Sequence, residues 1–527
     1  MSRQWTFPYP SQRMPVCADN VLATSQPLAA QAGLGMMARG GNAVDAALAA
    51  AIALTVVEPT SNGLGSDLFA QVWDGDSLHG INGSGRAPRG LDIHRFRGMH
   101  SMPMHGWDAV TVPGAVQAWR DLSQRFGRMP FGDLFEPAIR YARDGFVISP
   151  MVARQWAAVS KTHATRPEFA ATFLPGGRPP QAGERFFNPD QARSLGLLAR
   201  SHGQALYQGE LAEALVRQAT EQGGALRLQD LAEHASSWVD PVGWPMQDWE
   251  VHEMPPNGQG LAALMALGIL DILEVGRWSV DSGQAIHYQV EAMKAAFAEI
   301  HGHVGDPRAM THPVKRFLDP TLLEKLAGSI RSDKAARPVS RLPANGGTVY
   351  LAAADAQGRM VSLIQSNYLG FGSGVVIKGT GISLQNRGAG FVLDPRHPNC
   401  VAGGKRPFHT IIPGFVTSQG KPVLSFGVMG AHMQPQGHVQ VLQRIKLWGQ
   451  NAQSALDAPR WQVNPDCSLA LEPGLVESIG PKLAALGHEL VSDPPPRLFG
   501  GGQIVHCLDS GYAAASDPRK DGQAVGF

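Results

Sequence analysis

The clearest helical pattern of apolar positions lies in residues 41–58, GNAVDAALAAAIALTVVE. Apolar residues recur at helical spacing from Val44 to Leu54, with Gly-Gly-Asn before them and Pro59 just after the segment, which are typical start and stop signals. This pattern predicts a buried helix. The Gly/Ser loop PTSNGLGSD follows, and LFAQVWDGDSLHGING then predicts a hairpin that turns at Asp74 to Asp76.

Further along the chain the pattern is helical and then changes to strands. Residues 110 to 340 are mostly helical in character, as in GQAIHYQVEAMKAAFAEIHGH at 283–303. The polar, basic segment at 329–347, SIRSDKAARPVSRLPANGG, has no apolar period and predicts an exposed linker.

After that linker, TVYLAAAD and MVSLIQS on either side of AQGR predict a hairpin, and GKPVLSFGVMG and GGQIVHCLD predict further strands. We therefore expect the last 180 residues, 527 minus 347, to form a separate α/β unit that begins at Thr348.

Composition places the chain among globular enzymes. A length of 527 residues allows about three to four average domains or one large core. With 43% hydrophobic and 17% charged residues the sequence is typical of a loop-rich α/β protein. The net charge of +1 gives no reason to expect nucleic acid or an anionic membrane as a partner, which leaves small molecules as the expected substrates.

The N-terminal residues have no apolar stretch of the kind that signal peptides carry, and the run from Ala46 to Val57 is too short to cross a bilayer. We therefore expect a soluble, cytoplasmic protein. The four cysteines are scattered without CxxC spacing, which indicates neither a zinc site nor disulfides. His301 and His303 have no further ligand at metal-binding spacing, so no metal and no organic cofactor is expected.

Thr348 stands where the flexible PANGG segment meets the first of these strands. An internal threonine is a poor nucleophile because its own backbone nitrogen is an amide. Cutting the chain before it would free an α-amine with an ordinary pKa of about 7.7 to 8.0, which can act as a base within the same residue. Gly346 and Gly347 have no Cβ to obstruct attack on the preceding carbonyl. A Gly-Gly-Thr sequence alone, however, is usually an ordinary loop end.

Further segments stand in order along almost the whole chain: GNAVDAALAAAIALTVVEPTSNGLGSD, TVPGAVQAW, PPNGQG, TVYLAAADAQGRMVSLIQSNYLGFGSGVVIKGTGISLQNRGAGF, GGKRPFHTIIPG, GVMGAHMQ and AAASDPRKDG. With these segments the sequence resembles the γ-glutamyltransferase family of N-terminal nucleophile (Ntn) hydrolases. The resemblance implies an α/β (α+β) fold, a four-layer αββα sandwich. That sandwich is shared by a large chain, 1–347, and a small chain, 348–527, which stay associated after cleavage between Gly347 and Thr348.

The resemblance also implies roles for individual residues. Thr348 matches the nucleophile and Ser366 matches a hydroxyl that hydrogen-bonds to it. Gly430 and Ala431 match the pair whose backbone N–H groups form the oxyanion hole; a backbone donor survives the change from Gly to Ala.

The residues that bind glutamate in the family are mostly replaced. The arginine for the α-carboxylate is Ser84, the acidic residue for the α-ammonium is Gly390, and a glutamine is Arg387. The paired serines are His409 and Thr410, and an asparagine is Tyr368. These changes favour a small pocket for a carboxylate without an amino group, to which an arginine fork or His432 could donate. This pattern of replacements resembles the oxamate amidohydrolase branch of the family. The predicted substrate-binding residues are Arg387, Arg86, His409, Tyr368 and Asn62, and Asp67 either contacts substrate or orders its loop.

We therefore predict a self-processing amidohydrolase that acts on a small carboxylate-bearing amide, with hydrolysis of oxamate to oxalate and ammonia in purine and oxalurate degradation as the leading hypothesis. Two alternatives stay open: a γ-glutamyl hydrolase or transferase acting on glutathione, and an unprocessed, non-catalytic binding relative. A dimer of the two-chain unit is also left open.

Overall fold

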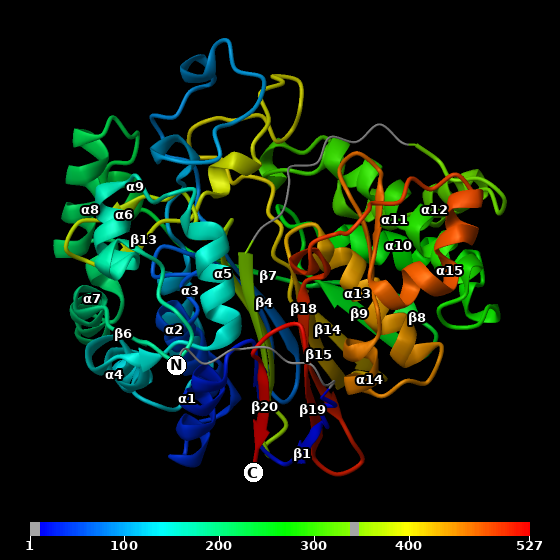
Figure 1. Ribbon diagram of the computed structural model, residues 1–527, viewed down its shortest axis with the longest axis horizontal. Helices are drawn as coiled ribbons and strands as arrows, with labels where there is room; N and C mark the ends of the chain where they lie inside the picture. The colour runs from blue at the N-terminus through cyan, green and yellow to red at the C-terminus, as the bar shows by residue number, and fades with distance from the viewer. Residues whose placement is uncertain (1–10, 338–346) are drawn as a thin grey trace, which may run out of the picture.

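Two sheets face each other at the centre of the molecule (Figure 1). The structure, a computed structural model, describes residues 11–337 and 347–527. In these residues the first sheet consists, in spatial order, of β20 (Gln523–Gly526), β2 (Val21–Thr24), β10 (Gly347–Ala354), β11 (Met360–Tyr368), β3 (Asp67–Trp73), β4 (Leu78–Gly83) and β7 (Ser237–Val239). The second consists of β1 (Val16–Ala18), β19 (Tyr512–Ser516), β18 (Gly501–Cys507), β15 (Lys421–Met429), β14 (Gly414–Ser418), β9 (Trp249–Glu253) and β8 (Val242–Met246).

Helices cover the outer face of each sheet (Figure 1). The first sheet is flanked by α1 (Pro27–Ala38), α2 (Ala43–Val57), α3 (Ala115–Phe126), α4 (Glu136–Asp144), α5 (Pro150–Ser160), α6 (Pro167–Phe173), α7 (Pro189–Arg200), α8 (Glu210–Glu221) and α9 (Leu228–Ala232). The second is flanked by α10 (Gly260–Ile272), α11 (Gly283–His303), α12 (Pro320–Ser329), α13 (Met433–Lys446), α14 (Ala452–Asp457) and α15 (Pro473–Ala485). Three small two-stranded antiparallel sheets pair β5 (Phe146–Val147) with β6 (Arg185–Phe186), β12 (Val376–Ile377) with β13 (Ile382–Ser383), and β16 (Trp461–Val463) with β17 (Leu469–Leu471). No helix of the described residues is long and apolar enough to cross a membrane.

The alternation of side chains along β10 separates two layers of core. Val349 and Leu351 join the cluster that α1, α2 and α3 share with the first sheet. Tyr350 and Ala352 point the other way, into a cluster that includes Phe415 of β14. Because successive strand residues face opposite sides, one strand contributes to both cores. The result is the predicted αββα order of layers.

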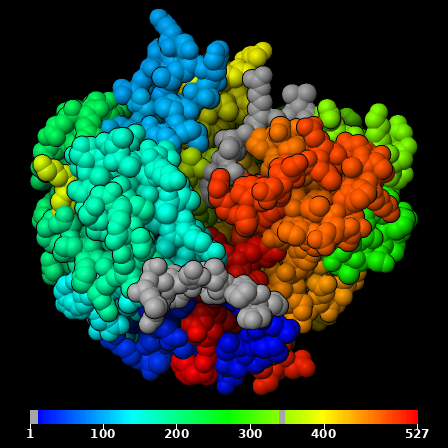
Figure 2. Space-filling model, viewed as in Figure 1, coloured from blue at the N-terminus to red at the C-terminus, as the bar shows by residue number. Residues whose placement is uncertain are grey.

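The strands after residue 347 do not form a unit of their own. β10 and β11 lie between β2 and β3, and β14 pairs with β9, so both sheets mix strands from before and after Thr348. The expectation of a separate C-terminal unit is therefore wrong, because periodicity identifies a strand but not its partner. In the space-filling view a hollow separates the cyan part of the chain from the orange and red part, and green residues from before Thr348 lie on both sides of it (Figure 2).

Local patterns were more informative than long-range ones. The helix predicted at 41–58 is α2, capped by Asn42, and the hairpin at Asp74 to Asp76 joins β3 and β4. The 283–303 helix is α11, and the hairpin after Thr348 is β10 and β11. The predicted strands are β3, β4, β10, β11, β15 and β18. The other strands of the two large sheets were not predicted, among them β1, β2, β14, β19 and β20. Of the predicted linker, residues 331–337 are mostly exposed and 338–346 lie outside the described residues.

Candidate active site

Thr348 lies at the start of β10, where the turn of the hairpin brings Ser366 back beside it. The Thr348 hydroxyl donates to Ser366 Oγ at 3.2 Å, and Ser366 Oγ donates to the Gly347 carbonyl at 2.8 Å. The Tyr368 N–H donates to the same Ser366 oxygen at 2.8 Å. The register of β10 against β11 shifts between Gly347 and Val349, as at a β-bulge. One hydroxyl thus contacts both the Thr348 side chain and the carbonyl of the peptide bond that precedes it.

Gly430 and Ala431 form the turn from β15 into α13. Both have positive φ, 126° and 52°, and the turn is closed by a hydrogen bond from the Met433 N–H to the Gly430 carbonyl at 2.9 Å. Ala431 packs in a small buried cluster with Tyr368, next to the hairpin that carries Thr348. Within residues 11–337 and 347–527, neither the Gly430 nor the Ala431 amide donates a hydrogen bond to the protein. Two free backbone donors at such a turn can stabilise an oxyanion.

Arg387 is the cation buried in this region. Its side chain is 1% exposed, lies over the Tyr368 ring at 4.6 Å and donates from Nη1 to Thr410 Oγ1 at 2.7 Å. Burial lowers the Arg387 pKa to about 10, so the guanidinium stays charged at neutral pH. Its Nε and Nη2 atoms have no hydrogen-bond partner within the described residues. Buried charged donors without partners are costly, so these two atoms are suited to bind an anion.

The Gln259 side chain connects the surrounding loops by hydrogen bonds. Its Nε2 donates to the Thr410 carbonyl at 2.6 Å and to the Ala431 carbonyl at 2.9 Å, and its Oε1 lies 3.3 Å from His432 Nδ1. The side chain is fully buried. Sequence reasoning missed Gln259, although it lies in the family-like segment PPNGQG.

His432 and Tyr368 carry further unpaired polar atoms. Because the Gln259 Oε1 can only accept, His432 Nδ1 carries the hydrogen, and His432 Nε2 is left as an acceptor without a partner in the described part of the chain. Burial and the Arg387 charge lower the His432 pKa to about 4, so the ring is neutral at neutral pH. The expectation that His432 donates to an anion is therefore not met. The Tyr368 hydroxyl, also unpartnered and buried, can donate instead.

His409 is engaged by the protein. Its Nδ1 accepts from the Ile411 N–H at 3.3 Å, so its Nε2 carries the hydrogen and donates to Asp67 Oδ2 at 3.1 Å. Both side chains are fully buried. Burial raises the Asp67 pKa to about 7, whereas burial and Arg387 lower that of His409 well below its ordinary value. We read the pair as a neutral imidazole beside a carboxyl that orders its loop.

Asn62 and Arg86, predicted to bind substrate, also have partners within the protein. The Asn62 amide donates to the carbonyls of Leu54 and Glu58, each at 3.0 Å, and so holds the loop after α2. Arg86 Nη1 pairs with Asp306 at 3.1 Å on a partly exposed surface. The structure therefore brings together Thr348, Ser366, Tyr368 and Arg387, whereas His409, Asn62 and Arg86 make structural contacts. The partners of His409 and Arg86 are distant in sequence, so the sequence could not show these contacts.

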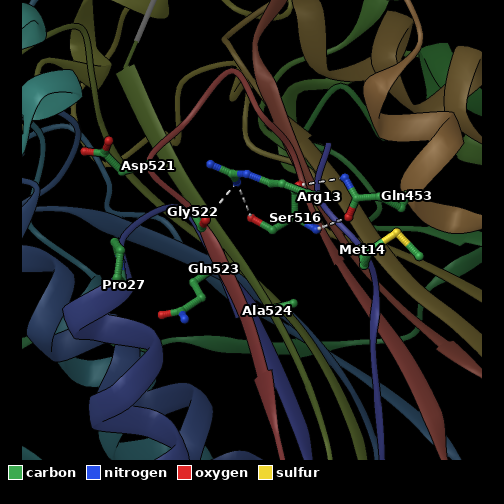
Figure 3. Close-up of a pocket in the computed structure, with 9 residues that line it drawn as sticks. All are labelled: Arg13, Met14, Pro27, Gln453, Ser516, Asp521, Gly522, Gln523 and Ala524. Atoms are coloured by element: carbon green, nitrogen blue, oxygen red, sulfur yellow. Dashed lines mark hydrogen bonds between the residues drawn. The ribbon is translucent and has the colours of Figure 1, made fainter. Parts of the chain in front are cut away.

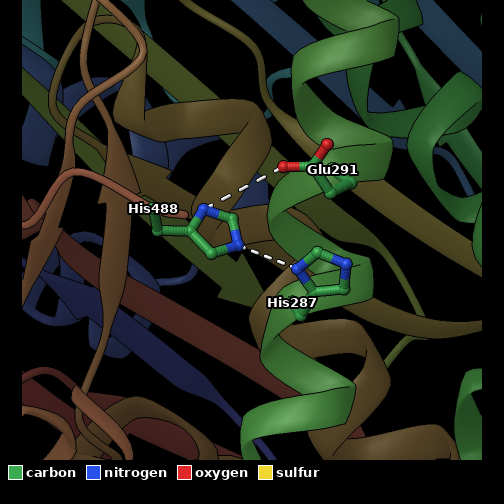
Figure 4. A group of neighbouring side chains, drawn as sticks. All are labelled: His287, Glu291 and His488. Carbon is green, nitrogen blue, oxygen red and sulfur yellow. Dashed lines mark hydrogen bonds and ion pairs between the residues drawn. The ribbon is translucent and has the colours of Figure 1, made fainter. Parts of the chain in front are cut away.

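One group of His, Cys, Asp and Glu side chains among the described residues is close enough to hold a metal ion (Figure 4). His287 Nδ1 lies 2.8 Å from His488 Nε2, and His488 Nδ1 lies 4.0 Å from Glu291. The Lys294 ammonium, however, contacts the same Glu291 oxygen at 2.8 Å and occupies the place of a cation. Glu291 also accepts from the Ala336 N–H at 2.8 Å, so this group anchors the chain that leads toward residue 338.

A cavity of about 400 Å³ lies between the two ends of the chain (Figure 3). Arg13 extends across it and donates to Ser516 Oγ at 3.2 Å and to the Gly522 carbonyl at 2.7 Å. The guanidinium is thus used to fix the segment between β19 and β20. No residue around Thr348 lines this cavity.

Comparison with known proteins identifies relatives that match nearly the whole chain. The gamma-glutamyltranspeptidase family model matches residues 29–527. The glutathione hydrolase-like YwrD proenzyme of Bacillus subtilis is 35% identical over 511 residues, 95% of this chain and 97% of that protein. The oxamate amidohydrolase proenzyme of Klebsiella pneumoniae is 36% identical over 517 residues, 95% of this chain and 97% of that protein. The crystal structure of cephalosporin acylase from Bacillus halodurans superposes with a TM-score of 0.94 at 43% identity, covering 100% of this chain and 99% of that one.

The two facing sheets between helical layers are therefore the fold of an Ntn hydrolase. Within that class, the chain belongs to the gamma-glutamyltranspeptidase family. The chain is therefore a hydrolase of that family, and both curated relatives named above are proenzymes.

Proposed function

We propose that the precursor is cut between Gly347 and Thr348 and that Thr348 is the nucleophile of the mature enzyme. The hydrogen bonds that join the Thr348 hydroxyl, Ser366 and the Gly347 carbonyl support this assignment, since they place the attacking oxygen and the carbonyl around one side chain. The cut leaves a large chain of 347 residues and a small chain of 180 residues, 527 minus 347. The mixed strands of both sheets keep the chains associated.

In the mature enzyme the freed α-amine of Thr348 takes the proton of its own hydroxyl as the oxygen attacks the amide carbon of the substrate. The amine then returns the proton to the leaving nitrogen, and water releases the acyl group in a second step. The amides of Gly430 and Ala431 hold the oxyanion, each contributing about 3 to 4 kcal/mol if they act as other oxyanion-hole donors do. Ser366 orients the nucleophile.

We further propose that the substrate is an amide whose acyl group carries a carboxylate but no α-ammonium. The observation that carries this proposal is the pair of donors on buried Arg387, beside the hydroxyl of Tyr368, all three without a partner among the described residues. The Asp67 carboxyl already accepts hydrogen bonds from the Gly85 and Gly114 amides and from His409, and it is not free to hold an ammonium. Oxamate is the smallest member of this class and remains the leading candidate, in purine degradation as predicted.

A γ-glutamyl substrate such as glutathione is the second candidate. It is favoured by the 35% identity to the glutathione hydrolase-like protein of Bacillus subtilis. Its α-ammonium would need an acidic partner, and Gly390 stands where the family has one. The α-ammonium, which a γ-glutamyl compound carries and oxamate lacks, therefore distinguishes the two candidate substrates.

Substrate preference is tested with the purified, cleaved enzyme and amides that differ in one feature at a time. Ammonia release is measured from oxamate, succinamate and glutaramate, and glutamate release from glutathione and γ-glutamyl-p-nitroanilide. We expect kcat/KM to be highest for a substrate of the first set. Preference for the γ-glutamyl compounds would reject the pocket assignment, and activity only on the longer amides would reject oxamate alone.

Thr348→Ala tests the nucleophile separately from the substrate. On a denaturing gel the wild-type chain is expected as two bands and the variant as one band near 56.3 kDa. Thr348→Ser keeps a hydroxyl and is expected to be cleaved. Efficient cleavage of the alanine variant, or a small chain that begins at another residue by N-terminal sequencing, would refute the assignment.

A further inference from the structure

Glu58 is a buried carboxyl group that the mechanism above does not use. It follows the last residue of α2 and is 2% exposed. The Ser25 hydroxyl donates to its Oε2 at 2.6 Å and the Ser61 hydroxyl donates to its Oε1 at 3.1 Å. Both bonds stabilise the ionised form of the carboxyl. Burying a carboxylate in the core is costly even when two hydroxyl groups donate to it. The residues around Glu58 therefore indicate its role.

Ser61 lies beside Gly347, the residue that precedes the bond proposed to be cut. A Cβ atom built on Gly347 would lie 3.2 Å from the Thr60 carbonyl oxygen, 3.3 Å from Ser61 Cα and 3.6 Å from Ser61 Oγ. The Ser61 carbonyl accepts from the Asn367 N–H at 3.1 Å, which fixes this loop to the strand that carries Ser366. Two oxygen acceptors therefore face the residue that cleavage separates from Thr348.

We infer that Ser61 and Glu58 position the α-amine that cleavage creates on Thr348. Once Gly347 is no longer bonded to it, the amine lies beside the Ser61 hydroxyl and the Thr60 carbonyl, and both accept its hydrogen bonds. The Ser61 hydroxyl continues to donate its hydrogen bond to Glu58, and the negative charge of Glu58 stabilises the ammonium form of the amine. Ser61 and Glu58 are positioning residues that act through the amine. The inference rests on Thr348 being the new N-terminus, as proposed above.

Other charges also face Glu58. Lys520, in the segment between β19 and β20, lowers the Glu58 pKa, and the neighbouring Asp521 raises it. Burial is the largest influence and leaves the Glu58 pKa raised. A cation placed near Glu58 by cleavage opposes that effect, so we expect the carboxyl to be ionised more readily in the mature enzyme than in the precursor.

The amine can be titrated without any substrate. Cyanate carbamylates only unprotonated amines, so the pH dependence of labelling at the N-terminus of the small chain, followed by mass spectrometry, gives the apparent pKa of the Thr348 amine. Glu58→Gln and Ser61→Ala are compared with the wild-type enzyme. Glu58→Gln removes the negative charge, and Ser61→Ala removes the hydroxyl that links this charge to the amine. Each substitution is expected to lower the pKa of the Thr348 amine by roughly 1 unit. The pH profile of kcat/KM on the preferred amide is expected to shift in the same direction.

Thr55→Val is the matched control, because Thr55 lies on α2 and its hydroxyl bonds to the Ile52 carbonyl at 2.7 Å. It is expected to mature and to titrate as the wild-type enzyme does. An unchanged amine pKa in Ser61→Ala and Glu58→Gln would overturn the inference, as would loss of cleavage in both variants when Thr55→Val is cleaved. A wild-type small chain that does not begin at Thr348 refutes the proposed nucleophile instead, and N-terminal sequencing separates that outcome.

Discussion

At the scale of single residues, Arg387 shows how much of a binding site resides in atoms that have no partner. Three of its features act together: the residue is buried, it packs on the Tyr368 ring, and two of its donors have no partner in the part of the chain that the structure describes. The family-like segment LQNRGAGF indicated the residue type. Only the structure separates it from Arg86, whose guanidinium is already neutralised by Asp306. A sequence cannot show this difference, since Asp306 lies 220 residues from Arg86.

Arg387→Lys should therefore weaken substrate binding more than Arg86→Gln does. A lysine keeps the charge but loses the planar fork, and a lost charge-assisted hydrogen bond of about 1.5 to 3 kcal/mol corresponds to roughly a 10- to 100-fold rise in KM. Steady-state kinetics on the preferred amide measures both variants. Equal effects of the two substitutions would contradict the assignment of the carboxylate to Arg387.

Asp67 makes stability depend on pH. Burial raises its pKa from 3.8 to about 7. Between these values the folded chain keeps a proton that the unfolded chain has released, so the Asp67 contribution to stability falls as pH rises through that range and levels off above about 7. Asp67→Asn should lessen this fall. Melting temperatures at pH 4.5, 6 and 7.5, in a Thr348→Ala background that keeps one chain, compare the two proteins; identical pH slopes would argue against the raised pKa.

At the scale of elements, the hairpin of β10 and β11 was predictable and its surroundings were not. The apolar run TVYLAAAD, the AQG turn and the return through IQSNY were sufficient to place Ser366 beside Thr348. The fit of the hairpin against the second sheet depends on remote residues. In β15, Gly427 faces Tyr350, and a Cβ at this position would lie 2.4 Å from the Tyr350 ring.

Gly427→Ala is expected to destabilise the packing between the two sheets by about 1 to 3 kcal/mol, because a methyl group would overlap the Tyr350 ring. Gly35→Ala is its control, since Gly35 lies within α1 and a Cβ there meets nothing within 4 Å. The control should gain about 0.5 to 1 kcal/mol from the higher helix propensity of alanine. Thermal unfolding in the Thr348→Ala background compares them. A neutral Gly427→Ala would show that the ring can move aside.

At the scale of the whole molecule, the central observation is that each sheet is built from both sides of the proposed cut. The order of motifs along the sequence predicted the layers through family resemblance, whereas the pattern of apolar residues suggested a separate C-terminal unit. The pattern failed because the sequence of a strand does not show its partner. The sequences of β10, β11 and β20 do not reveal that these strands pair with β2 and β3. Strand pairing at such sequence distances leaves no local signal.

Residues 348–527 produced alone should therefore not fold. β10 would lose β2, β11 would lose β3, and the apolar faces that contact α2 would be exposed. We expect a soluble complex only when residues 1–347 are produced in the same cell. Co-purification of an untagged large fragment with a tagged small one, followed by circular dichroism, measures this. A small fragment that is folded by itself would contradict the shared core.

The contact of Ser366 with both the Thr348 hydroxyl and the Gly347 carbonyl also has a temporal consequence. Attacking atom and target are parts of one folded chain, so the proposed cut is a unimolecular event whose half-time does not change on dilution. Maturation can then begin once β10 and β11 have paired. Its rate constant is set by the strand geometry around residue 348 and does not depend on the concentration of the protein.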